Sequence, residues 1–120
     1  MIYTPLQLNA GCPAGQSQPF YSIGPDGTQI LFNLPTGLKF ALTDVSLVIA
    51  NISPGPPTLV SAGIQQTVGT NQVQRWVFAG YILQNVERSF ITPIILSTPF
   101  DVQNGGAAYL NVNLFGYFIA

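Results

Sequence analysis

The chain has 120 residues, of which 48% are hydrophobic and only 6% are charged, and its formal net charge is −1. Average soluble chains carry about 25% charged residues. This chain must therefore stay soluble through amide and hydroxyl groups or cover much of its surface with partners, and we favour the second explanation. The few charges form no basic cluster, so electrostatic binding of nucleic acid is not expected.

The side chains needed for most catalytic and metal chemistry are missing. The sequence has no histidine, which removes the commonest general base and the usual zinc, copper and iron ligands. Cys12 is the only cysteine, so no intrachain disulfide can form, and we interpret it as an inert side chain near a flexible end. The few carboxylates suggest neither a glycosidase pair nor a calcium loop. The sequence therefore predicts no enzyme, no cofactor and no metal site.

The first residues carry no recognisable targeting signal. "MIYTPLQLNAG" lacks the basic region followed by an apolar run that defines a signal peptide, so we expect cytoplasmic synthesis. No stretch resembles a membrane span of about 20 apolar residues. A membrane partner is not expected.

Residues 1–27 are rich in proline, glycine, glutamine and serine and show no sustained periodicity. We interpret them as an extended N-terminal arm with one short strand around residues 3–8. The arm ends at "GPDG" (24–27), a strong turn sequence, because proline presets φ and Asp-Gly accepts a positive φ.

Strand-like runs separated by turns fill the rest of the chain. They are rich in alternating or β-branched apolar residues and end at glycine, proline or asparagine. Pro93 cannot donate to a ladder, so its run should be an edge strand, a bulged strand or two short strands. Residues 28–120 are predicted to form one all-β sandwich domain. We expect strands at 28–34, 39–51, 58–64, 73–83 and 89–98, a short strand near residue 100, a turn at 103–106 and a closing strand at 107–120.

The closing segment "AAYLNVNLFGYFIA" has two different faces. Alternation directs one set of side chains to the core, namely Ala108, Leu110, Val112, Leu114 and Phe118. The other set mixes amides with aromatic rings, which is the composition of an interface. We therefore predict a central closing strand with a candidate oligomer interface made of Tyr109, Asn111, Asn113, Phe115, Tyr117 and Ile119.

The segment "QRWVFAGY" (74–81) is a second candidate ligand site or interface. Alternation places Trp76 and Phe78 on one face, with Arg75 and Tyr81 on the other. Trp76 could stack on a sugar, or Arg75 and Tyr81 could anchor a partner. The alternative is that the two large aromatic residues belong to the core and Arg75 is an exposed or ion-paired strand residue.

Asp44 lies among apolar residues in the middle of an expected strand. An unpaired carboxylate there would be costly. We predict a structural ion pair with Arg75 or Arg88, or hydrogen bonds from backbone N–H groups.

Three segments resemble the small jelly-roll modules of bacterial and phage proteins. These are "LPTGLKFALTDVSL", "STPFDVQNGG" and the terminal "GYFIA". The chain is also similar in plan to the trimeric jelly rolls of the tumour-necrosis-factor and complement-C1q type. The resemblance implies an antiparallel jelly-roll sandwich and a trimer, and it transfers no site residue.

Two functional hypotheses follow. The first is a structural subunit, a trimer in a virion or other extracellular particle, which would serve there with other particle subunits as a decoration, cement, capsid or appendage protein. The second is a lectin-like module that binds glycans through Trp76, tyrosines and amides. An enzyme is kept only as a residual hypothesis.

Overall fold

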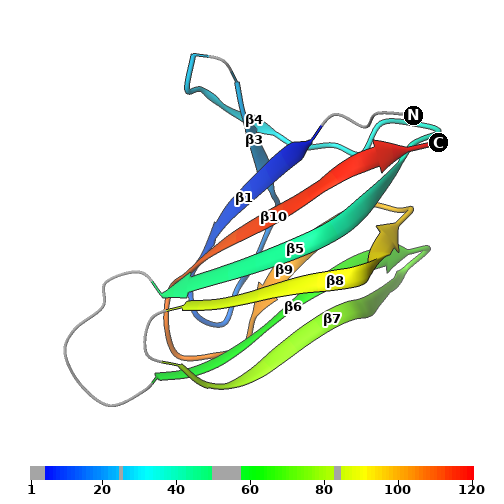
Figure 1. Ribbon diagram of the computed structural model, residues 1–120. Helices are drawn as coiled ribbons and strands as arrows, with labels where there is room; N and C mark the ends of the chain where they lie inside the picture. Colours follow the sequence, from blue (N-terminus) through cyan, green and yellow to red (C-terminus); the bar gives the residue numbers. More distant parts are fainter. Residues whose placement is uncertain (1–4, 25, 50–57, 83–84) are drawn as a thin grey trace.

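The computed structural model describes residues 5–24, 26–49, 58–82 and 85–120 (Figure 1). Every regular element in these residues is a β-strand. The strands are β1 (Leu6–Cys12), β2 (Ser17–Gln18), β3 (Tyr21–Ile23), β4 (Gln29–Leu31), β5 (Lys39–Ile49), β6 (Thr58–Val68), β7 (Asn71–Ile82), β8 (Asn85–Leu96), β9 (Phe100–Asn104) and β10 (Leu110–Ile119).

The strands form two antiparallel sheets packed as a sandwich. The six-stranded sheet has the order β4-β3-β1-β10-β5-β8, and the four-stranded sheet has the order β2-β9-β6-β7. Without the β3-β4 hairpin, the remaining strands form nested antiparallel pairs: β1 with β10, β2 with β9, β5 with β8, and β6 with β7. A long hairpin rolled up in this way is a jelly roll, so the predicted fold class is confirmed.

The β3-β4 hairpin extends the six-stranded sheet beyond β1 and projects from the sandwich (Figure 1). Its turn depends on Gly27, which has a φ of 81°, and on the Asp26 carboxylate, which accepts a bond from the Thr28 N–H at 3.0 Å. The Gly27 N–H also donates to the Gly24 carbonyl at 3.0 Å, as expected for a turn at "GPDG", of which Pro25 lies outside the described residues.

β1 and β2 belong to the two sheets of the sandwich, and β3 extends one of them, which corrects the expected N-terminal arm. β1 pairs along its whole length with β10, and Leu8, Ala10 and Cys12 are fully buried. Cys12 is therefore a core residue and does not lie near a flexible end. Burial raises the pKa of its thiol, and Sγ lies 3.1 Å from the carbonyl oxygen of Gln16.

The core between the sheets consists of aliphatic side chains and one aromatic cluster. Phe40 is fully buried, and its ring centroid lies 5.7 Å from that of Phe100 and 6.2 Å from that of Phe118. Phe32 stacks on Phe118 at 6.0 Å. This cluster joins the two sheets at the end of the sandwich where β10 finishes.

A bulge interrupts β8 at the predicted place. β8 pairs with β5 on both sides of the interruption, but four residues around Pro93 lie between Ser89 and Ile94, opposite Thr43 alone. The missing N–H of Pro93 accounts for the break in the ladder. Of the three alternatives expected for this run, β8 combines the edge strand and the bulge, and Ile91 in the bulge is fully exposed.

Other strand boundaries differ modestly from those expected. β6 extends to Val68, β4 covers only Gln29–Leu31, and β9 includes the first two residues of the expected turn. Asn104 stabilises the turn itself, because its buried side chain donates a hydrogen bond to the Ala108 carbonyl at 2.7 Å. Residues 50 and 51 of one expected strand and residue 83 of another lie outside the described residues.

Candidate functional site

The alternation predicted for the closing strand is present in β10. Leu110, Val112 and Leu114 are fully buried, whereas Asn111 and Asn113 are partly exposed between them. Beyond the close approach at Gly116, Phe118 turns to the aromatic cluster. β10 therefore has a core side and an outward side, and its outward residues are Asn111, Asn113, Phe115, Tyr117 and Ile119, with Tyr109 just before the strand.

The outward side of β10 lies in the middle of a polar sheet surface, which we call the outer face. Because β10 lies between β1 and β5, its outward residues Asn111, Asn113 and Phe115 have cross-strand neighbours on both sides, whereas Tyr117 and Ile119 pair with β5. Asn113 accepts hydrogen bonds from Asn9 at 2.8 Å and Gln7 at 3.4 Å. The outer face consists of Gln7 and Asn9 of β1, the outward residues of β10, Asp44 and Ser46 of β5, and Glu87 and Ser89 of β8.

A polar depression of about 410 Å³ lies at the β1-β3 end of the outer face. We call it the tyrosine-amide depression. Two phenol rings and four amide side chains line it, together with Gly11 and Pro13. A Cβ on Gly11 would collide with the Tyr109 hydroxyl, so glycine at this position lets the Tyr109 ring lie close to β1. The phenols and amides are those of Tyr21, Tyr109, Asn9, Gln18, Gln29 and Asn111.

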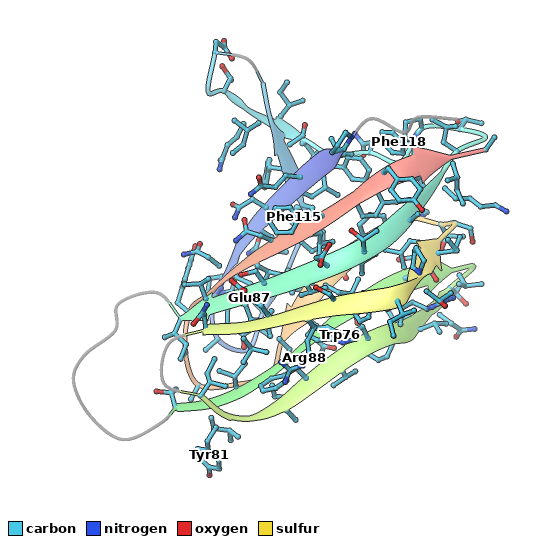
Figure 2. All side chains as sticks on the ribbon, viewed as in Figure 1. Trp76, Tyr81, Glu87, Arg88, Phe115 and Phe118 are labelled. Atoms are coloured by element: carbon cyan, nitrogen blue, oxygen red, sulfur yellow. The ribbon has the colours of Figure 1, made fainter. Side chains whose placement is uncertain are left out.

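Two further depressions flank Phe115, whose position on the outer face Figure 2 shows. The first, of about 480 Å³, lies over β1, β10 and β5 and includes Gln7, Thr43 and Tyr117. The second, of about 400 Å³, lies over β5 and β8 and includes Ser46 and Glu87. Phe115 and Asp44 line both, so the two depressions are neighbours on either side of one aromatic ring.

The structure replaces the predicted ion pair of Asp44 with hydroxyl partners. Ser89 donates to Oδ1 at 2.5 Å, and Thr43 donates to Oδ2 at 2.8 Å. Asp44 is opposite Ser89 in the ladder, whereas Arg88 is opposite the inward-facing Val45. Since neighbouring residues in a strand point to opposite faces, Arg88 is directed away from Asp44.

Arg88 instead lies over an aromatic ring at the open edge between the sheets. Its guanidinium carbon is 5.5 Å from the centroid of Phe78, and its Nη1 donates to the carbonyl of Glu87 at 2.9 Å. Figure 2 shows Arg88 on the β7 side of β8. Arg75, the other predicted partner, lies in the opposite sheet and donates to Oε1 of the buried Gln66 at 3.1 Å.

Trp76 and Phe78 of β7 are partly buried and pack against the core, which agrees with the alternative stated for these two residues. Trp76 packs against the core and meets Phe90 edge to face at a centroid distance of 6.3 Å. Tyr81 is 73% exposed and points away from the sandwich (Figure 2). Trp76, Arg75 and Tyr81 therefore do not converge on one site.

Asp101 is a partly buried carboxylate outside the outer face. It lies on β9 opposite Gln65, and burial raises its pKa, although a hydrogen bond from Gln65 opposes this effect. Its Oδ1 is buried without a hydrogen-bond partner in the described part of the chain. Among the described residues no three His, Cys, Asp or Glu side chains group as a metal site, and no helix is long and apolar enough to cross a membrane.

Sequence reasoning missed the contribution of β1 and the β3-β4 hairpin to the outer face. Gln7, Asn9, Tyr21 and Gln29 lie in or next to the segment expected to be an arm. The missed signal was the alternation in "LQLNAGC", in which Leu6, Leu8, Ala10 and Cys12 occupy every second position.

Comparisons with known proteins add little to this description. No protein-family model and no curated protein matches the chain. A solved structure titled "CBM4 structure and function" is similar at 12% identity and a TM-score of 0.35, over 96% of this chain and 93% of that chain. Because the identity and the TM-score are low, function must be inferred from the residues of this chain.

Proposed function

We propose that the protein is a binding module that recognises a glycan on the outer face of its six-stranded sheet. The observation that carries the proposal is the tyrosine-amide depression, where Tyr21 and Tyr109 flank four amide side chains. Amides both donate and accept hydrogen bonds, which matches the hydroxyl groups of sugars. Tyrosine rings offer an apolar surface for the C–H face of a sugar and a hydroxyl at their edge.

The other two depressions extend the same surface chemistry. Phe115 is 37% exposed between them, and the residues around it include an amide, hydroxyls and two carboxylates, together with Arg88 and the apolar Pro5, Leu6 and Val45. An aromatic ring surrounded by hydrogen-bonding groups is the arrangement that orients a polar ligand at a mostly preformed site. The glycan-binding hypothesis therefore moves from Trp76, which is a core residue, to the outer face.

A glycan array followed by calorimetry with the best ligand tests the proposal. Tyr109→Ala and Asn111→Ala each remove a group from the tyrosine-amide depression and should weaken binding at least about tenfold, the equivalent of about 1.4 kcal/mol. Tyr81→Ala is the matched control, because it removes an exposed tyrosine from the other sheet and should leave the affinity unchanged. The proposal is contradicted if no glycan on the array binds the protein, or if all three variants bind with equal affinity.

A second candidate function is supported by exposed apolar side chains. Ile91 is fully exposed, Val77 is 56% exposed on β7, and Ile23 and Ile30 of the β3-β4 hairpin are 57% and 55% exposed. Such residues are unusual on a monomer that has so few charges. They favour an assembly subunit, which we propose as a homotrimer of a virion or other extracellular particle, with the outward residues of β10 as its interface.

The two candidates make opposite predictions for the outer face. A trimer that buries this face leaves no room there for a glycan. Sedimentation at micromolar concentration tests the assembly, and Phe115→Ser should dissociate a trimer that uses β10. A stable monomer contradicts the assembly candidate and leaves the glycan proposal in place.

A further inference from the structure

Two carboxylates and one arginine line the depression between β5 and β8. Asp44 and Glu87 contribute carboxylates to the depression between β5 and β8. Asp44 receives hydrogen bonds only from the neutral hydroxyls of Ser89 and Thr43, so no cation neutralises it through these contacts. The nearby Arg88 is engaged with the Phe78 ring and the Glu87 carbonyl. Because the two carboxylates outnumber the single guanidinium, the depression between β5 and β8 has a formal charge of −1.

A carboxylate lined by hydroxyl donors can accept further hydrogen bonds. Each carboxylate offers about four lone-pair sites, and two of those on Asp44 are used by Thr43 and Ser89. Sugar hydroxyls can donate to the remaining sites. A uronate or sulfate group at the same position would instead meet like charge, and such repulsion is a common source of specificity.

The three depressions lie diagonally across the sheet, because the first lies beside Asn111 of β10 and the other two flank Phe115, four residues further along the same strand. They extend from Tyr21 on β3, over β1, β10 and β5, to Glu87 on β8. The strands β3 and β8 are four intervals apart, or about 19 Å, because neighbouring strands lie about 4.8 Å apart. This distance accommodates several consecutive sugar rings.

We infer that the ligand is a neutral, linear oligosaccharide that crosses the strands, with one end in the tyrosine-amide depression and the other beside Asp44 and Glu87. This inference rests on the proposed glycan-binding function and specifies the class of glycan. The amides and tyrosines hold one end of the chain, Phe115 supports its middle, and the carboxylates accept hydroxyl hydrogens and reject anionic chains.

Chain length is tested with neutral oligosaccharides of glucose, mannose or galactose, from one to six units, titrated into the full chain. Affinity should rise by at least about tenfold between the disaccharide and the hexasaccharide. An affinity that reaches its maximum at the disaccharide overturns the extended binding mode, although it leaves glycan binding intact.

Charge selection is tested with each neutral hexasaccharide and its C6-oxidised, uronate counterpart. The wild type should bind the neutral chain at least about tenfold more tightly, and added salt should narrow the difference by screening. In the double variant Asp44→Asn and Glu87→Gln, the ratio of the two affinities should shift towards the uronate by at least about tenfold. Asp101→Asn, which removes a carboxylate from the other sheet, should leave the ratio unchanged.

The outcomes separate the inference from the function on which it rests. Equal binding of neutral and uronate chains by the wild type, or an unchanged ratio in the double variant, overturns the charge selection alone. If no chain binds, neutral or anionic, both the inference and the proposed function are overturned.

Discussion

Gly116 is a position of β10 at which β5 leaves no room for a side chain. A Cβ at this position would lie 2.8 Å from Cζ of Phe40 and would collide with the Ala41 carbonyl oxygen. Both neighbours are buried, so neither can move without disturbing the core. The glycine that interrupts the aromatic end of the sequence is therefore required by packing between two central strands.

The variant Gly116→Ala should lose about 2 kcal/mol of stability, the cost of overpacking a core by one methyl group. For a domain of this size the loss corresponds to a fall in Tm of roughly 8 °C. Gly105→Ala is the control, because the nearest atoms to its added Cβ are 3.7 Å away. Differential scanning calorimetry measures the Tm of both variants. Equal Tm values would show that β10 and β5 can move apart at Gly116 and accommodate a methyl group.

At the scale of elements, β10 holds the six-stranded sheet together. It pairs with β1 on one side and β5 on the other, and its last residues bring Phe118 into the aromatic cluster. Without β10 the sheet would divide into β4-β3-β1 and β5-β8, because β1 and β5 do not pair with each other.

Deletion of residues 116–120 should abolish the fold. It removes the ladder between the end of β10 and residues 39–42 of β5, and the loss of a packed phenylalanine alone costs about 3–5 kcal/mol. Total stabilities are about 5–15 kcal/mol. Deletion of Ala120 alone, which lies beyond β10 and is exposed, should be tolerated. Circular dichroism and thermal melting measure both variants, and a cooperative melt of the longer deletion would refute the central role of β10.

Elements with a strongly alternating pattern, or with a proline that interrupts strand pairing, could be predicted from the sequence. The two sides of β10 and the bulge at Pro93 follow from such local patterns. Only the start of β1 was predicted, as a short strand around residues 3–8, because its later polar and small residues gave a weak signal beside the surrounding prolines and glycines. The partners of Asp44 were missed because they depend on the register between β5 and β8, which no local pattern specifies.

At the scale of the whole molecule, the scarcity of charge simplifies the response to pH. The sequence has no histidine, so no side chain with an ordinary pKa near neutrality titrates between about pH 6 and 8. In the acid range the ionisation of Asp101 destabilises the folded state. Because burial raises its pKa in the folded state, the folded protein holds this proton more tightly than the unfolded chain does.

Stability therefore falls as the pH rises from the ordinary aspartate pKa through the raised pKa of Asp101, and the penalty is complete above it. Asp101→Asn should be more stable than the wild type at pH 7, and the difference should shrink as the pH falls towards about 3.9. Thermal melts across this range measure it. Asp26→Asn provides a control of opposite sign, because hydrogen bonds from Thr28 lower the pKa of Asp26. A difference for Asp101→Asn that does not vary with pH would contradict the assignment.

The position of the single tryptophan has a practical consequence for all of these experiments. Trp76 packs against the core beside Phe90, at the edge formed by β7 and β8, and does not line the outer face. Its fluorescence should change when the sandwich unfolds, and it should stay the same when a ligand binds to the outer face of the six-stranded sheet. Unfolding can thus be followed optically in the unlabelled protein, and ligand binding can be followed independently through its heat.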